Sequence, residues 1–135
     1  MNYLITGGTG LIGKAFIESL PKYTSQITVL TRDKIKAKKL LGSWINCIDE
    51  LSIVDIENSD VIVNLAGEAI ADKRWSETQK DKICQSRWGI TQQLVDLINQ
   101  ANNPPSVFIS CSAIGIYGRQ NKHPIDENFE HFHQE

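Results

Sequence analysis

The segment Leu4–Gly13, LITGGTGLIG, constrains the fold of this chain more than any other feature of its sequence. Four glycines follow a short apolar run, which costs backbone entropy unless a turn needs positive φ or a ligand must approach the backbone. The spacing of Gly7, Gly10 and Gly13 is GxxGxxG, and starting from Gly8 it is GxGxxG. Between a strand and a helix, this spacing predicts a turn that binds a pyrophosphate through free backbone N–H groups. A glycine-rich turn without a ligand is the alternative.

The remaining sequence alternates apolar runs of strand length with longer helix-period segments, the pattern of βαβ units. It predicts strands over Asn2–Thr6, Gln26–Thr31, Trp44–Ile48, Asp60–Ala66 and Ser106–Ser112, and helices over Gly10–Leu20, Lys34–Leu41 and Ser76–Ala101. The stretch DELSIVDIENSD predicts a short helix or turn. We therefore expect an α/β fold with a doubly wound parallel sheet in strand order 3-2-1-4-5. Its binding crevice would lie at the carboxyl ends of strands 1 and 4.

Polar residues mark the ends and one face of the predicted helices. Asp33 is placed to cap the helix that starts at Lys34, and Ser76 with Gln79 has the spacing of a capping box. Arg87 falls in the apolar stripe of the long helix. Either it contacts substrate or cofactor-loop groups, or it forms an ion pair that holds loop ends together, and we favour the structural role.

The end of the second predicted strand, VLTRDK, bears on the choice of dinucleotide. An NAD site would place an acidic residue at this strand end to bind the ribose hydroxyls. Here Arg32 occupies the tip, where a guanidinium can bind a 2′-phosphate, and this favours NADP. Asp33 as a ribose ligand keeps NAD possible, and Arg32 as an ordinary exposed residue is the structural alternative.

The fourth and fifth predicted strands end on the same edge of the sheet. In VNLAG, the small residues Ala66 and Gly67 would let the backbone approach the adenosine half of a cofactor, and Asn64 can bond neighbouring loops. In SCSAIGIYG, Ser112 could orient a substrate hydroxyl or carbonyl near the nicotinamide ring. The alternatives are an ordinary strand exit and a serine that only satisfies the loop backbone.

The composition and the apolar runs of the sequence limit the classes of partner that we expect. The formal net charge is −2 and 22% of the residues are charged, so we expect a small-molecule partner and no nucleic acid. No apolar run approaches the roughly 18 to 20 residues of a membrane span, and MNYLITGG has neither a basic leader nor a cleavage site, so we expect no membrane and a cytoplasmic location. The three cysteines are widely spaced, and the HxH of His131 and His133 has no evident third ligand, so we expect no metal.

The motifs TGGTGLIG, NLAG and SCSAIGIYG together resemble those of the extended short-chain dehydrogenase/reductase superfamily. NLAGEAIADKRWSETQKDKICQSRWGITQQLV is similar to the bacterial epimerase-family proteins, which are described as NAD(P)-dependent nucleoside-diphosphate-sugar epimerases. The resemblance covers residues 1–118 and implies an NAD(P)-binding Rossmann domain with a small-molecule, sugar-nucleotide substrate. It implies a substrate-side role for Ser112 and cofactor contacts at Gly7, Gly10, Leu11, Ile12, Arg32, Ala66 and Gly67, beside the close helix packing expected at Gly13.

Two departures from the superfamily pattern leave the activity open. Its usual catalytic pair is a tyrosine with a lysine four residues later, and Tyr3, Tyr23 and Tyr117 all lack that lysine. Superfamily members are also roughly twice as long, so residues 119–135 would be a polar tail or the start of a missing substrate-binding region. The chain is either an oxidoreductase or sugar-nucleotide epimerase, or a dinucleotide-binding module without turnover. An exposed fifth strand would favour a homo-oligomer.

Overall fold

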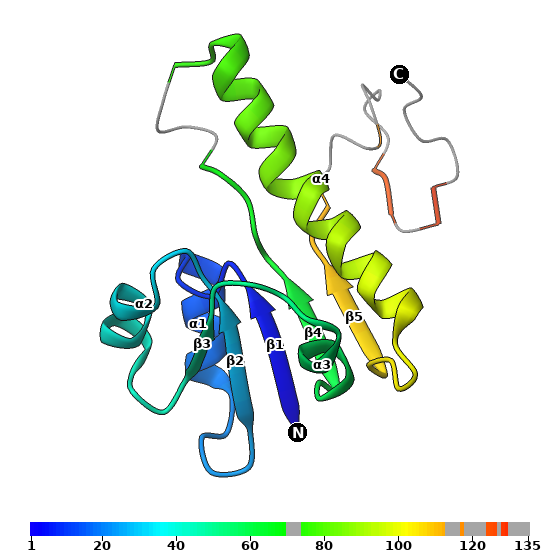
Figure 1. Cartoon of the computed structure of the whole chain (residues 1–135). Coiled ribbons are helices and arrows are strands. Elements are labelled where there is room, and N and C mark those ends of the chain that lie inside the picture. The colour runs from blue at the N-terminus through cyan, green and yellow to red at the C-terminus, as the bar shows by residue number, and fades with distance from the viewer. Residues whose placement is uncertain (70–73, 113–116, 118–123, 127, 130–135) are drawn as a thin grey trace.

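The computed structural model describes residues 1–69, 74–112, 117, 124–126 and 128–129. Its parallel strands form one sheet in the order β3-β2-β1-β4-β5 (Figure 1). The strands are β1 (Asn2–Thr6), β2 (Gln26–Leu30), β3 (Asn46–Ile48), β4 (Val61–Asn64) and β5 (Val107–Ser110). The predicted doubly wound α/β fold and its strand order are confirmed.

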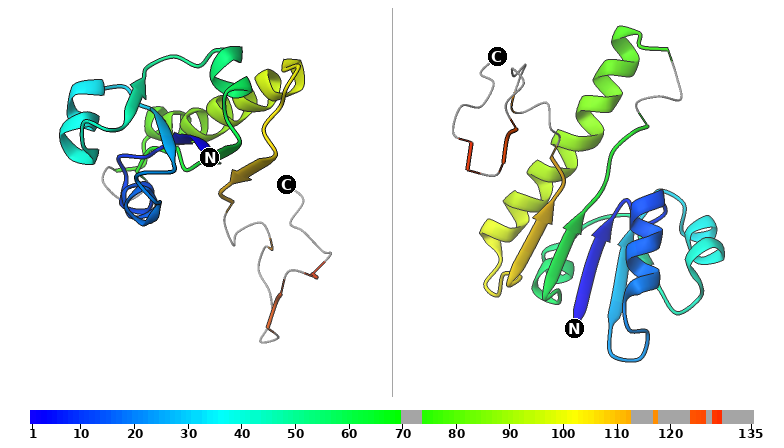
Figure 2. Two further views of the ribbon diagram at one scale, coloured as in Figure 1. Left: turned by 90° about the horizontal axis from the view of Figure 1, so that it is seen from below. Right: turned by 180° about the vertical axis from the view of Figure 1, so that it is seen from behind.

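Helices cover both faces of this sheet (Figures 1 and 2). They are α1 (Leu11–Ser19), α2 (Lys34–Leu41), α3 (Ile53–Glu57) and α4 (Glu77–Gln100). Side chains alternate between the faces of a strand, so Ile5 packs in a cluster with residues of α1 and α2, and Leu4 packs in a second cluster with residues of α3 and α4. Both Leu4 and Ile5 are fully buried. Strand β1 therefore anchors the core on both sides.

The helix caps agree with the prediction in part. Asp33 caps α2 by accepting a hydrogen bond from the backbone N–H of Lys36 at 2.9 Å. Ser76 caps α4 by accepting from the N–H of Gln79 at 3.2 Å, but the predicted capping box is wrong in its second half. The side chain of Gln79 is buried in the molecule, so it does not reach back to Ser76. A complete capping box instead starts α3, between Ser52 and Asp55.

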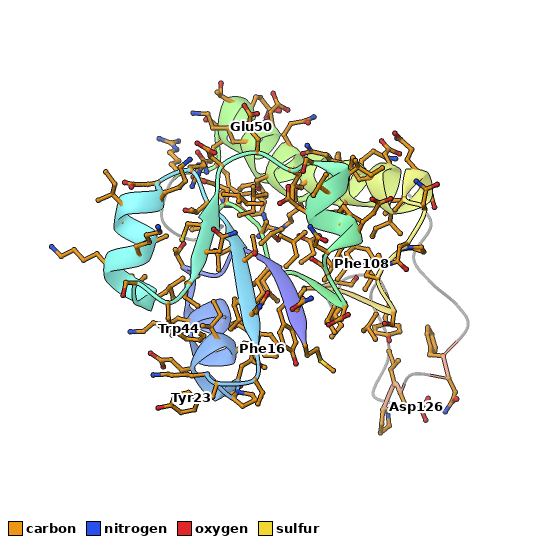
Figure 3. All side chains as sticks on the ribbon, turned by 60° about the horizontal axis from the view of Figure 1, so that its bottom comes forward. Phe16, Tyr23, Trp44, Glu50, Phe108 and Asp126 are labelled. Atoms are coloured by element: carbon orange, nitrogen blue, oxygen red, sulfur yellow. The ribbon has the colours of Figure 1, made fainter. Side chains whose placement is uncertain are left out.

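The third strand is shorter than predicted, because Trp44 precedes it. Gly42 ends α2 with a φ of 102°, and a Cβ there would meet the indole ring of Trp44. The ammonium of Lys22 lies 5.7 Å from the centre of the same ring. These contacts involve Trp44 ahead of the strand (Figure 3), and the pairing of β3 with β2 starts at Asn46, opposite Thr28.

The two ends of the chain's long βαβ unit, β4 and β5, differ in burial. Ile62 of β4 is fully buried, whereas Val107 and Ile109 of β5 are 43% and 47% exposed. Phe108 lies at the β5 end of the molecule, far from Trp44 (Figure 3). Among the described residues β5 pairs only with β4. Helix α4 extends beyond the carboxyl ends of both strands (Figure 1).

No helix within the described ranges is both long and apolar enough to cross a lipid bilayer.

Candidate functional site

A cleft of about 970 Å³ opens at the carboxyl ends of β1, β4 and β5. The glycine-rich loop and the chain that follows β4 form one wall of it, and α4 with the end of β5 forms the other. Its lining consists of Gly7, Gly10, Leu11, Ile12, Gly13, Asn64, Leu65, Ala66, Gly67, Arg87, Trp88, Thr91, Gln92, Val95, Ser110, Cys111 and Ser112. The cleft therefore lies where the strand order predicted a binding crevice.

Backbone packing explains the glycines of the first wall. Gly7 has a φ of 67°, and a Cβ there would run into the carbonyl group of Leu65. A Cβ on Gly13 would meet the carbonyl oxygen of Gly7. The N–H of Gly10 donates to that same oxygen at 3.0 Å. The loop is thus a tight turn packed against the chain after β4, and two of its glycines have no room for a side chain.

The loop leads directly into α1, whose first turn borders the cleft. Gly10 is the N-cap and supplies no side-chain acceptor to the first turn. The first backbone N–H groups of a helix have no intrahelical acceptor, and the helix dipole adds positive potential at that end. Leu11 and Ile12 line the cleft there and are exposed. This arrangement suits an anionic group such as a pyrophosphate.

A partly buried hydrogen-bond network lies at the base of the cleft and joins its two walls. The hydroxyl of Thr6 donates to Oδ1 of Asn64 at 2.6 Å and accepts from the N–H of Ala66 at 3.1 Å. The side-chain amide of Asn64 donates to Oγ1 of Thr91 at 2.9 Å and to Oγ of Ser110 at 3.3 Å. Asn64 therefore connects β1 and the chain after β4 to α4 and β5.

Arg87 fastens the chain after β4 to α4. Its Nη1 donates to the backbone carbonyl oxygens of Glu68 at 3.2 Å and Ile83 at 3.3 Å. Beside it, the hydroxyl of Ser86 accepts a hydrogen bond from the N–H of Glu68 at 2.8 Å. A Cβ on Gly67 would lie 2.8 Å from the guanidinium carbon of Arg87. Arg87 thus holds a loop end as expected, but through backbone carbonyls and not through the ion pair that we expected.

The structure brings most of the predicted site residues to one cleft. Those that line it are Gly7, Gly10, Leu11, Ile12, Gly13, Ala66, Gly67 and Ser112. Arg32 is not among the lining residues; it is exposed, two residues after the end of β2. The sequence did not single out the contributions of α4 beyond Arg87, which are Trp88, Thr91, Gln92 and Val95. Their helical spacing, adjacent to the apolar stripe, is the signal that could have identified them.

Away from the cleft, burial and an ion pair shift the pKa values of Cys47 and Asp49. Burial raises the pKa of the Cys47 thiol, against the opposing effect of nearby Lys38 and Lys34. A hydrogen bond from Lys34, at 2.9 Å between Nζ and Oδ2, lowers the pKa of Asp49. Among the residues that the structure describes, no group of three or more His, Cys, Asp or Glu side chains could hold a metal ion. The HxH of the sequence lies outside those residues.

Comparison with known proteins identifies the family. The sequence model of the NAD dependent epimerase/dehydratase family matches residues 3–134. The chain belongs to this family. That result confirms the resemblance drawn from the sequence motifs, and it agrees with the glycine-rich turn at the start of the sheet.

Curated relatives of this epimerase-family chain are considerably longer. An epimerase family protein of Staphylococcus haemolyticus is 36% identical over 128 residues, which cover 95% of the chain and 42% of the relative. The chloroplastic SDR39U1 homolog of Arabidopsis thaliana is 35% identical over 143 residues, with coverage of 95% and 39%. The chain therefore spans about two-fifths of the length of these relatives.

Solved structures of the epimerase type share the fold. Human epimerase family protein SDR39U1 (isoform 2), solved with NADPH, is 28% identical with a TM-score of 0.75, covering 96% of the chain and 42% of the human chain. UDP-glucuronic acid 4-epimerase from Bacillus cereus, in complex with UDP-glucuronic acid and NAD, is 20% identical with a TM-score of 0.73. The match covers 96% of the present chain and 45% of the Bacillus chain. At this identity it supports the fold alone.

Proposed function

We propose that this epimerase-family chain binds a nicotinamide dinucleotide across the carboxyl ends of β1 and β4. The observation that carries the proposal is the fit of the turn at Gly7–Gly13. Two of its glycines have no space for a Cβ, and the uncapped N-terminus of α1 borders the same cleft. Such a turn can approach a pyrophosphate closely and donate backbone hydrogen bonds to it.

The residues around the turn have complementary roles in this proposal. Leu11, Ile12 and Gly13 would donate backbone N–H groups or allow close approach at the pyrophosphate, and Ala66 with Gly67 would lie against the adenosine half. When bound, the nicotinamide ring accepts or donates a hydride. Ser112, exposed at the end of β5, would position a substrate hydroxyl or carbonyl toward that ring.

We propose NADP as the preferred cofactor, with NAD as the alternative. Arg32 is exposed after β2, at the strand end where a 2′-phosphate would lie. Asp33, the residue that could bind ribose hydroxyls instead, accepts the N–H of Lys36 as the cap of α2. Its carboxylate is thus engaged in the fold. Among similar structures, the human protein carries NADPH and the Bacillus epimerase carries NAD, so the choice is a property to be measured on this chain.

The reaction that we propose is that of an oxidoreductase or sugar-nucleotide epimerase on a small molecule. The second candidate is a dinucleotide-binding module without turnover. Within the 135 residues no tyrosine has a lysine four positions later, and the chain spans about two-fifths of the length of its relatives. In either case residues 1–118 would form the dinucleotide-binding domain, and 119–135 a polar tail or the start of a substrate-binding region. NADPH oxidation measured over a panel of carbonyl compounds and sugar nucleotides distinguishes the two candidates.

Calorimetric titration of NADPH into the wild type and Gly10→Val tests the binding proposal. Gly10 has a φ of −76°, which valine can adopt, and it lines the cleft. A Cβ there would lie 3.2 Å from the carbonyl oxygen of Gly7, a close contact that a small shift of the turn relieves. We expect affinity to fall at least roughly a hundredfold while the circular dichroism spectrum is retained. Equal affinities in the two proteins would contradict the proposal.

We further propose that the chain forms homo-oligomers through β5 and resides in the cytoplasm. The exposed apolar side chains of Val107 and Ile109 support association, as does the edge of β5 that pairs with no further strand among the described residues. Light scattering should show a mass above that of a monomer for the wild type and a monomer for Ile109→Lys. The location is tested by fractionating source cells, because the Arabidopsis relative is named as chloroplastic.

A further inference from the structure

We infer that Arg87 is a second oxyanion-binding group of the cleft, separate from the glycine-rich turn, and that the molecule held against α4 carries a phosphate or carboxylate. The inference deepens the proposed function and rests on it in one respect: the cleft must be the ligand site. Its support is the charge, the environment and the hydrogen bonding of Arg87.

Arg87 is the only charged residue among the described residues that line the cleft. The rest of that lining is apolar, hydroxylic, amide or glycine. The half-buried guanidinium is therefore the side-chain source of positive potential in this lining, beside the N-terminus of α1. The α4 wall therefore selects for negative charge.

The guanidinium is half-buried and has no ion-pair partner in the described part of the chain. Its two acceptors, the carbonyl oxygens of Glu68 and Ile83, are neutral and both are bound by Nη1. A guanidinium has five N–H donors, so Nε and Nη2 retain theirs. A partly buried cation with unused donors is stabilised when an oxyanion binds to it.

Gly67 lets the chain pack against the face of the guanidinium. A Cβ at this position would lie 2.8 Å from Cζ, 2.9 Å from Nη2 and 3.2 Å from Nε, so a larger residue would displace the group. The two hydrogen bonds from Nη1 meanwhile fix the plane of the group. The Nε–Nη2 edge is thus preorganised for a bidentate contact with phosphate or carboxylate oxygens.

The test measures oxyanion binding directly at Arg87 by NMR of its Nε–Hε group, with inorganic pyrophosphate as the probe. It uses the Gly10→Val background to separate Arg87 from the glycine-rich turn. We expect pyrophosphate to shift the Arg87 signal in this background, and Arg87→Gln to weaken pyrophosphate binding roughly tenfold or more, the scale of a hydrogen bond to a charged group. Arg87→Lys, which keeps the charge but not the fork, should retain part of the affinity.

Ser86→Ala is the matched control for a purely structural effect. It removes a second α4 side chain that bonds the backbone of Glu68 while leaving the guanidinium in place. Affinity retained in Ser86→Ala and lost in Arg87→Gln supports the inference. Equal affinity in Arg87→Gln and its Gly10→Val parent overturns it, as does an unchanged Arg87 signal or equal losses in Ser86→Ala and Arg87→Gln.

The source of the oxyanion is decided with the otherwise wild-type chain saturated with NADPH. If pyrophosphate still shifts the Arg87 signal, the group serves a second ligand, which is then an anionic substrate. If NADPH itself shifts the signal and pyrophosphate adds nothing, the oxyanion belongs to the dinucleotide. Failure of the proposed function would appear separately, as NADPH affinity that Gly10→Val leaves unchanged.

Discussion

The two walls of the cleft differ in the groups that they present to a ligand. The wall formed by Gly7–Gly13 and Leu65–Gly67 presents mainly backbone groups, beside the exposed side chains of Leu11 and Ile12. Its turn is tight enough that a Cβ on Gly7 or Gly13 meets neighbouring backbone. The wall formed by α4 and β5 presents side chains, among them the 68% exposed Trp88. The contrast is between a surface fixed by the path of the chain and one that depends on which residues the chain carries.

This difference predicts different responses to mutation. At Gly7 and Gly13 of the backbone wall, a substitution must move the chain, so stability and binding change together. In the side-chain wall, a substitution changes what the cleft recognises while the helix and strand persist. Asn64 is the exception, because it lies between the walls and hydrogen-bonds to residues of both.

Gly7→Ala is expected to have the largest effect. Alanine would be held at a φ of 67° with its Cβ against the carbonyl of Leu65, so we expect the free energy of unfolding to fall by about 2 to 5 kcal/mol. Urea denaturation measures it. The control is Gly89→Ala on α4, where the new Cβ would have an ordinary contact 3.7 Å from Oε1 of Gln85. That variant should gain about 0.5 to 1 kcal/mol, and destabilisation by both substitutions would refute the contrast between the walls.

Asn64→Ala tests the link between the walls. It leaves the hydroxyl groups of Thr6, Thr91 and Ser110 without the amide that joins them, so we expect a loss of about 2 to 3 kcal/mol in unfolding free energy. Asn46→Ala, which removes a hydrogen bond of 3.2 Å to Thr28 on an exposed surface, should cost less than about 0.5 kcal/mol. Thermal unfolding of both variants gives the comparison, and equal losses would mean that the buried network adds nothing.

Arg32→Ala changes neither wall, since Arg32 does not line the cleft. If Arg32 binds the 2′-phosphate, NADPH binding should weaken by about 1 to 2 kcal/mol and NADH binding should be nearly unchanged. Calorimetry with both cofactors measures the difference. A uniform loss for NADPH and NADH would remove Arg32 from the site and would return the NADP preference to an open question.

Asp49 and Lys34 provide the smallest effect, remote from both walls. Their hydrogen bond lowers the pKa of Asp49 in the folded chain, so the unfolded chain binds a proton more readily. The stabilisation is present above the unfolded pKa of about 3.9 and is lost as pH falls through the lower folded value. The stability difference between wild type and Asp49→Asn should therefore shrink from pH 6 to pH 2.5, with Glu50→Gln as the control. A difference that is constant over this range would contradict the assignment.

The sequence by itself determined the features that depend on short stretches of chain. The spacing of Gly7, Gly10 and Gly13 predicted the turn, and alternating apolar runs predicted the strand order that the structure confirms. The cap of α2 depends only on Asp33 and on the backbone N–H of Lys36, three positions later. Such features are predictable because backbone geometry over a few residues limits which side chains can occupy each position. The binding roles of Arg32 and Ser112 stay predictions.

Only the tertiary structure decided the surroundings of Asn64, Gln79 and Arg87. Asn64 was expected to bond neighbouring loops, yet its amide reaches Ser110, 46 residues away. Ser76 and Gln79 have the spacing of a capping box, but the side chain of Gln79 is buried. The complete capping box lies at the start of α3, between Ser52 and Asp55. Arg87 was expected to form an ion pair with a carboxylate, but its guanidinium donates hydrogen bonds to two backbone carbonyl oxygens. These outcomes depend on how α4 packs over the sheet, because packing determines which acceptors come within hydrogen-bonding distance and which groups are buried.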